Sequence, residues 1–219
     1  MTIQEALKTY FGYHTFRPMQ QNIIESVLAK KDTVVLMPTG GGKSLCYQIP
    51  AIVMPGVCIV VSPLIALMKD QVEGLVANGV AADYLNSTLS YDEQQDVKDA
   101  VQRGEISLLY VSPEKLVSQD FLYFLQSIPV NLFAVDEAHC ISSWGHDFRP
   151  EYTRLALLKQ QFPEVPIIAL TATADRLTRL DITAQLKLEN PKVSLASFDR
   201  PNLKLTVLPG KNSMKKIVS

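Results

Sequence analysis

Short apolar runs alternate along the chain with longer segments in which apolar residues recur at helical spacing. Continuous apolar runs predict buried strands, and strand–helix alternation predicts βαβ units. We therefore predict an α/β fold with a mostly parallel sheet covered by helices on both faces. The predicted strands are residues 32–37, 56–62, 81–86, 106–112, 131–137 and 165–173. The predicted helices are residues 43–54, 64–78, 90–103, 114–127, 151–161 and 175–187, preceded by helices over 2–11 and from Pro18 to about 29.

The alternation weakens after Glu189, where two short strand-like pieces lead into a tail rich in Lys, Gly and Ser. The chain has neither an internal repeat nor a low-complexity segment. This pattern predicts one domain over residues 1–195, which includes the two N-terminal helices, and a connecting segment over residues 196–219.

The composition of the chain excludes some classes of protein but does not indicate a ligand. The 219 residues carry a net charge of −1, so any nucleic-acid binding has to depend on a local surface. Cys46, Cys58 and Cys140 form no CxxC pair, which argues against a disulfide framework or a zinc site. The first residues lack the pattern of a signal peptide, and no apolar run approaches about 18 residues. We expect no membrane association and an intracellular location, in the cytoplasm, the nucleoid or the nucleus.

A glycine-rich stretch, "MPTGGGKS" at residues 37–44, follows a predicted strand and opens a predicted helix. Backbone N–H groups in such a loop converge on an anion, and glycine permits the tight path and a close approach to phosphate. Lys43 can reach the β and γ phosphates of a nucleotide, and the Ser44 hydroxyl can ligate Mg²⁺. The loop residues expected to contact nucleotide are Thr39, Gly40, Gly41, Gly42, Lys43 and Ser44. The alternative is a glycine-rich turn with an incidental lysine.

Two adjacent carboxylates, Asp136 and Glu137, come directly after the apolar run 132–135. Carboxylates at the end of a buried strand are costly unless they are paired or bound to metal. Asp136 therefore suits Mg²⁺ coordination opposite Ser44, and Glu137 suits orienting and deprotonating an attacking water. The alternative is an acidic pair that caps the following helix.

Eight short motifs occur in an order that resembles one family. In chain order they are "FRPMQ" (16–20), "MPTGGGKS" (37–44), "VVSPLIALMKDQV" (60–72), "YVSPEKL" (110–116), "DEAHC" (136–140), "WGHDFRPEY" (144–152), "ALTATA" (169–174) and "SFDRPN" (197–202). On these motifs the chain resembles the first RecA-like domain of superfamily 2 helicases, specifically the RecQ family of DNA helicases. The resemblance implies a RecA-like P-loop domain over nearly all of residues 5–205. It also accounts for Met37, which stands where the strict phosphate-loop pattern has glycine.

The resemblance assigns further residues to the nucleotide. It implies that Gln20 recognises adenine, because an amide can donate and accept at once, with Tyr13 and Arg17 packing around the base. It implies that His139 couples hydrolysis to domain movement through "TAT" at residues 171–173. Without the resemblance, Arg17 and Pro18 indicate only the start of a helix, and His139 is expected to have a structural role.

A second set of residues is implied to contact DNA. The loop 141–152 holds the only tryptophan, Trp144, with Phe148 and Arg149 nearby, and such side chains stack on unpaired bases. Ser62, Lys69 and Ser112 are implied to contact backbone phosphates. The alternatives are a tryptophan buried in the core and serines that only mark helix entries.

Together these features predict an ATP-dependent DNA helicase that uses ATP and Mg²⁺ on single-stranded DNA and on duplex/single-strand junctions. Polarity of 3′ to 5′ and roles in recombination and repair follow from the resemblance alone. A RecQ-like motor needs a second RecA-like domain that supplies an arginine. We expect this chain to be a fragment lacking that domain, with residues 196–219 as the linker, slow hydrolysis and no unwinding. The alternatives are an RNA-directed or remodelling ATPase of the same superfamily, a non-catalytic nucleotide-dependent docking module and a small-molecule kinase.

Overall fold

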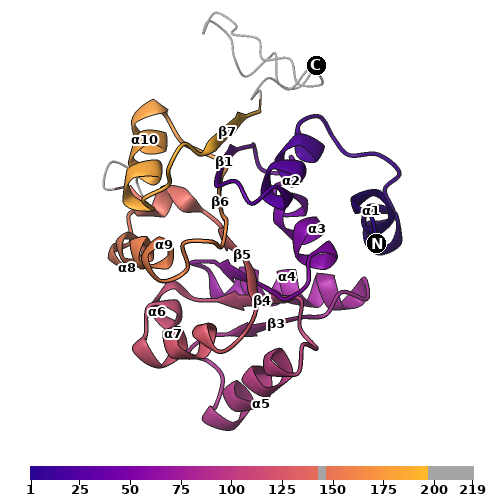
Figure 1. Cartoon of the computed structure of the whole chain (residues 1–219), viewed down its shortest axis with the longest axis vertical. Helices are drawn as coiled ribbons and strands as arrows, with labels where there is room; N and C mark the ends of the chain where they lie inside the picture. The colour runs from indigo at the N-terminus through magenta and orange to yellow at the C-terminus, as the bar shows by residue number, and fades with distance from the viewer. Residues whose placement is uncertain (143–146, 197–219) are drawn as a thin grey trace, which may run out of the picture.

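The computed structural model describes residues 1–142 and 147–196, and within them seven strands form one sheet (Figure 1). The strands are β1 (Thr33–Leu36), β2 (Val57–Val61), β3 (Ala82–Leu85), β4 (Leu108–Val111), β5 (Val130–Val135), β6 (Ile167–Thr171) and β7 (Lys192–Leu195). Their order in the sheet is β3-β4-β2-β5-β6-β1-β7, and every neighbouring pair is parallel. The carboxyl ends of all seven strands therefore lie along one edge, where open α/β sheets bind ligands.

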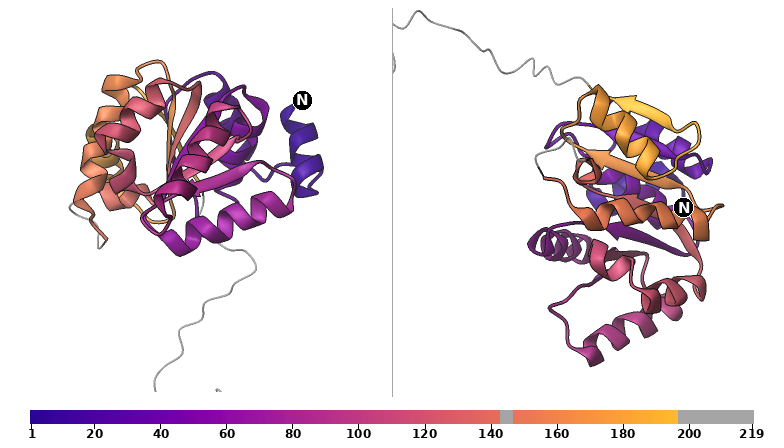
Figure 2. Two further views of the ribbon diagram at one scale, coloured as in Figure 1. Left: turned by 90° about the horizontal axis from the view of Figure 1, so that it is seen from below. Right: turned by 90° about the vertical axis from the view of Figure 1, so that its left-hand side faces the viewer.

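Helices cover both faces of this sheet (Figure 2). They are α1 (Ile3–Phe11), α2 (Gln20–Leu28), α3 (Leu45–Val53), α4 (Ile65–Ala77), α5 (Tyr91–Gln102), α6 (Pro113–Leu116), α7 (Gln119–Gln126), α8 (Pro150–Thr153), α9 (Leu157–Gln161) and α10 (Arg176–Gln185), with 3₁₀ turns η1 (Ala138–Ile141) and η2 (Arg154–Ala156). None of the helices in the described part of the chain has the length and apolar character needed to cross a membrane.

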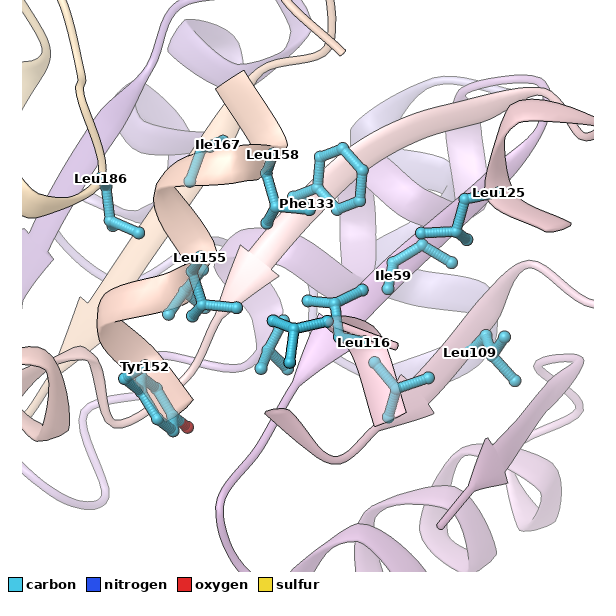
Figure 3. Packing of buried hydrophobic residues seen from close by; sticks show 14 of the residues in the cluster. Ile59, Leu109, Leu116, Leu125, Phe133, Tyr152, Leu155, Leu158, Ile167 and Leu186 are labelled. Atoms are coloured by element: carbon cyan, nitrogen blue, oxygen red, sulfur yellow. The ribbon is translucent and has the colours of Figure 1, made fainter. Parts of the chain in front are cut away.

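Alternate residues of each strand enter different cores, because successive side chains in a strand point to opposite faces. Ile59 of β2 packs with side chains from α5 to α10, and Figure 3 shows this core around Phe133 and Leu158. Val60, its neighbour, packs on the other face with side chains from α2, α3 and α4. Helix α1 lies outside this second layer, where its Leu7 joins residues of α2 and α3 in a small third cluster.

The predicted α/β fold, with a parallel sheet between two helical layers, is confirmed. All six predicted strands are present, one or two residues shorter at most ends. One of the strand-like pieces after Glu189 is β7, which pairs with β1 at the edge of the sheet, and the other lies outside the described residues. The proposed division at residue 195 coincides with the last residue of β7 and stays a prediction.

Three predicted helices differ from the structure. The helix expected over 114–127 is two helices, because Ser118 adopts an extended conformation (φ −73°, ψ 140°) as the N-cap of α7. The helix expected over 151–161 is α8, η2 and α9 in sequence. The helix expected from Pro18 begins at Gln20, since Met19 has φ 72°, a left-handed conformation that no α-helix contains.

Candidate functional site

The glycine-rich loop connects β1 to α3 and needs all three of its glycines. Gly40 and Gly42 have φ of 77° and 82°, which side chains other than glycine rarely adopt. Gly41 donates to the Pro38 carbonyl (2.9 Å), and a Cβ at Gly41 would lie 2.6 Å from Met37 Cγ. The loop is thus wound too tightly for side chains, as expected for a backbone that surrounds a phosphate.

The segment before α2 lies against this loop. The buried Gln20 amide donates to the Gly42 carbonyl (3.0 Å) and accepts from the Arg17 N–H (2.7 Å). The Arg17 guanidinium donates to the Gly40 carbonyl. The residues implied to hold the adenine therefore fix two carbonyls of the phosphate loop. No sequence signal predicted the two hydrogen bonds to the loop, which join residues 22 and 23 positions apart.

The acidic pair follows β5 at the same edge. Asp136 N–H donates to the Val61 carbonyl (2.9 Å), which extends the pairing of β5 with β2 by one residue. Glu137 then adopts φ 47° and ψ 43°, and its N–H donates to Asp136 Oδ1 (2.9 Å). A non-glycine residue in this conformation stores strain that typically marks functional positions.

Opposite charges surround Glu137. Its Oε1 lies 3.9 Å from Lys43 Nζ, and its Oε2 lies 3.2 Å from His139 Nδ1. These neighbours, His139 before Lys43, lower the pKa of Glu137, whereas burial and the adjacent Glu137 raise the pKa of Asp136. The surroundings therefore favour the charged form of Glu137 and disfavour the charged form of Asp136. The buried Asp136 is the carboxylate that gains most from a nearby cation.

His139 links the acidic motif to the end of β6. Its Nδ1 lies 2.9 Å from Thr171 Oγ1, and that hydroxyl donates to the Thr173 carbonyl (3.0 Å). On the other side of the ring, Nε2 lies 3.6 Å from Asp147 Oδ2. His139 therefore connects the acidic motif at residues 136–140 to the "TAT" motif at residues 171–173. That it couples hydrolysis to domain movement stays a prediction.

We predict that His139 makes stability depend on pH in the alkaline range. The Cys140 sulfur near Nε2 and the Glu137 carboxylate near Nδ1 raise the pKa of His139 from 6.5 to about 10. A raised folded-state pKa contributes stability that is complete below pH 6.5 and is lost as pH rises towards 10. His139→Gln should therefore lower Tm most in mild acid and progressively less towards about pH 10. Thermal unfolding across this range tests it, with the exposed His14→Gln as control, and a difference in Tm independent of pH would contradict it.

These elements enclose a cleft of about 510 Å³, within the size range of small-molecule sites. Of the residues predicted to bind nucleotide or act on it, the cleft is lined by Tyr13, Arg17, Gln20, Thr39, Gly40, Gly42, Lys43, Ser44, Asp136 and Glu137. Gly41 and His139 lie next to the cleft rather than on its wall. Ser44 and Asp136 supply a hydroxyl and a carboxylate oxygen to the same wall, a donor set that suits Mg²⁺.

Other residues of the cleft were not predicted: Leu7, Phe11, Thr15, Leu45, Gln48, Leu67 and Gln71. Leu7 and Phe11 belong to the apolar stripe of α1, which the sequence pattern assigns to packing alone. Gln71 lies in a motif that we assigned to DNA. These side chains reach the nucleotide cleft only because α1 and α4 pack beside α3, which local pattern does not reveal.

The two serines implied to contact DNA lie at the ends of β2 and β4. Ser112 caps α6, and its hydroxyl accepts from the Lys115 N–H (3.3 Å). This is the alternative role considered from the sequence, in which the serine marks the start of a helix. Ser62 is 2% exposed, and within the described residues its hydroxyl has no hydrogen-bond partner. Contact of Ser62 with a phosphate therefore requires a local rearrangement, whereas Ser112 is 8% exposed and lines a second cleft together with Lys115. Lys69, by contrast, is exposed on α4, with Nζ 3.8 Å from Glu73.

The aromatic-rich loop is described only in part. Phe148 is 41% exposed, as a stacking side chain would be. The Arg149 guanidinium donates to the Pro63 carbonyl (2.9 Å), so this loop is connected to the segment after β2. Trp144, the main predicted stacking residue, lies outside the described residues. The predicted contacts of these side chains with DNA stay predictions.

Residues 17–180 match the DEAD/DEAH box helicase family. The chain belongs to this family. It is 51% identical over 216 residues to the ATP-dependent DNA helicase RecQ of Pasteurella multocida (strain Pm70). This alignment covers 99% of this chain and 34% of the relative. It is 45% identical over 210 residues to the RecQ-like DNA helicase BLM of Xenopus laevis, covering 92% of this chain and 15% of the relative. The predicted resemblance to RecQ helicases is therefore confirmed, and the chain spans about a third of the length of the bacterial RecQ.

Solved structures agree on the fold of this DEAD/DEAH box domain. The Pyrococcus furiosus Hef helicase domain superposes with a TM-score of 0.65 at 19% identity, covering 92% of this chain and 41% of that one. The DUF1998 helicase MrfA superposes with a TM-score of 0.67 at 16% identity, covering 88% of this chain and 32% of that one. The predicted RecA-like helicase fold is confirmed.

Proposed function

We propose that this chain is the ATP-binding motor domain of a RecQ-type DNA helicase, which couples ATP hydrolysis to movement along single-stranded DNA. One observation carries the proposal. The cleft brings the phosphate loop and the acidic motif, about ninety residues apart in sequence, to within 3.9 Å at Lys43 and Glu137.

The side chains divide the chemistry of hydrolysis among them. Lys43 neutralises the charge that builds up on the transferred phosphoryl group, in a largely buried site where such an interaction is strong. Glu137, kept ionised by His139 and Lys43, orients the attacking water and accepts its proton. Ser44 and Asp136 would hold Mg²⁺, which supplies positive charge to the β and γ phosphates.

The same edge of the sheet provides the surface for DNA. Phe148 is exposed, the Arg149 guanidinium is hydrogen-bonded to the segment after β2, and the neighbouring Asp147 lies 3.6 Å from His139 of the acidic motif. The relatives are named DNA helicases, which favours DNA over RNA. We further propose that residues 1–195 work with a second RecA-like domain joined through residues 196–219, on single strands and junctions inside the cell.

The test of the DNA assignment is the affinity of this chain for fluorescent single-stranded DNA and for RNA of the same sequence. We expect DNA to bind more tightly, and Phe148→Ala to weaken it about tenfold, within the range for loss of one stacked base. The exposed Tyr123→Ala on α7 is the matched control and should leave the affinity unchanged. Equal binding of DNA and RNA would favour the RNA-directed alternative.

A further inference from the structure

A buried tyrosine lies at the end of the aromatic-rich loop. Tyr152 of α8 is 0% exposed, and its ring packs in the core shown in Figure 3. Its hydroxyl donates to the Asp136 carbonyl (3.1 Å). A buried tyrosine hydroxyl usually finds a partner, and here the partner is the backbone of the motif that carries the proposed base, Glu137.

The Asp136 carbonyl lies where the pairing of β5 with β2 ends. The Asp136 N–H donates to the Val61 carbonyl (2.9 Å), so residue 136 continues the parallel ladder of these strands. In such a ladder, a residue that donates to residue 61 accepts from the N–H of residue 63. Pro63 has no N–H. The Tyr152 hydroxyl therefore takes the place of the missing backbone donor.

The same peptide unit is held at its other side. Its N–H, which belongs to Glu137, donates to Asp136 Oδ1 (2.9 Å). Hydrogen bonds thus hold both the carbonyl and the N–H of this unit, and its plane cannot turn without breaking them. The next rotatable bond sets the φ angle of Glu137, which is 47°. The orientation of the peptide therefore decides where the Glu137 carboxylate lies.

The left-handed conformation of Glu137 depends on this support. A residue with a side chain is strained in this region and stays there only where the surrounding structure holds it. Turning the peptide plane would relieve the strain and would carry the carboxylate away from its present position, 3.9 Å from Lys43 Nζ. The hydroxyl of Tyr152 opposes that turn.

We propose that Tyr152 is a positioning residue, whose hydroxyl holds the peptide between Asp136 and Glu137 and thereby the carboxylate that acts on the attacking water. This inference rests on the proposed function of the cleft. Tyr152 lies behind the cleft rather than on its wall, so it acts through Glu137 and not by contact with ATP. The role belongs to the hydroxyl alone, because phenylalanine would fill the same space in the core.

The first test is single-turnover ATP hydrolysis by the wild-type chain and by Tyr152→Phe, together with the affinity for ATP. We expect Tyr152→Phe to slow hydrolysis about tenfold, because misplacing a reacting group by about 1 Å can cost ~100-fold and the base is displaced here without being removed. The affinity should stay within twofold of wild type. Thr33→Val is the matched control, since Thr33 is 0% exposed at the start of β1 and its hydroxyl also donates to a backbone carbonyl, that of Lys31 (3.1 Å). It should hydrolyse ATP at the wild-type rate.

A double-mutant cycle separates positioning from a general weakening of the fold. If Tyr152 acts through Glu137, Tyr152→Phe has no further effect on the rate in a Glu137→Gln background. Full additivity in the cycle, an unchanged rate in the single variant, or a loss of affinity equal to the loss of rate would each overturn the proposal.

The peptide itself gives a readout that does not depend on turnover. We expect the Glu137 amide proton to exchange with solvent about fivefold faster in Tyr152→Phe, the equivalent of one net hydrogen bond, and at the wild-type rate in Thr33→Val. Unchanged exchange in Tyr152→Phe would overturn the proposal even where wild-type hydrolysis confirms the function of the cleft. A wild-type chain without turnover would instead overturn the proposed function, and the role of Tyr152 with it.

Discussion

Lys43→Ala is expected to reduce ATP hydrolysis by this chain about 100-fold or more, as removal of a single transition-state contact does in other enzymes. The Lys43 ammonium is largely buried and 3.9 Å from Glu137, so little solvent screens its interaction with a phosphate. Affinity for ATP should fall as well, because we expect the lysine to contact the γ phosphate in the ground state.

Steady-state phosphate release and a binding titration measure the two effects of Lys43→Ala separately. Lys8→Ala, an exposed position on α1, is the matched control and should leave both unchanged. Hydrolysis by Lys43→Ala within twofold of wild type would show that turnover takes place elsewhere.

Glu137→Gln is expected to reduce hydrolysis by about 100-fold or more while ATP binding is retained, since a positioned general base contributes rate and not ground-state affinity. Glutamine keeps the shape of the side chain but can neither accept a proton nor carry charge. Removing that charge also removes repulsion of the γ phosphate, so ATP should bind at least as tightly.

The measurement for Glu137→Gln is single-turnover hydrolysis together with the affinity for ATP. Glu73→Gln on α4 makes the same chemical change at an exposed ion pair and should have no effect. Parallel loss of binding and hydrolysis would mean that Glu137 holds the loop in place rather than acting on water.

Strands β1, β2, β4 and β6 were predictable because their apolar runs are buried on both faces of the sheet, so local sequence and tertiary environment agree. The predicted helix bounds were wrong where the conformation of a single residue interrupts the helix, as at Ser118, which is extended between α6 and α7. Met19 likewise adopts a left-handed conformation that its residue type does not suggest.

Some features of the candidate site were predictable from local sequence and others were not. Lys43, Ser44, Asp136 and Glu137 could be found because a phosphate loop and a carboxylate pair have local signatures. The hydrogen bond from Tyr152 to the Asp136 carbonyl could not, because it joins residues 16 positions apart through the packing of α8 beside the end of β5.

The central claim is that the cleft hydrolyses ATP as one half of a DNA-driven motor. Its most direct test is the rate of ATP hydrolysis by this chain with and without single-stranded DNA, beside Lys43→Ala. We expect slow, Mg²⁺-dependent turnover that responds little to DNA and is lost in the variant. Strong stimulation by DNA would contradict the need for a second RecA-like domain, and turnover that survives in Lys43→Ala would contradict the assignment of the cleft.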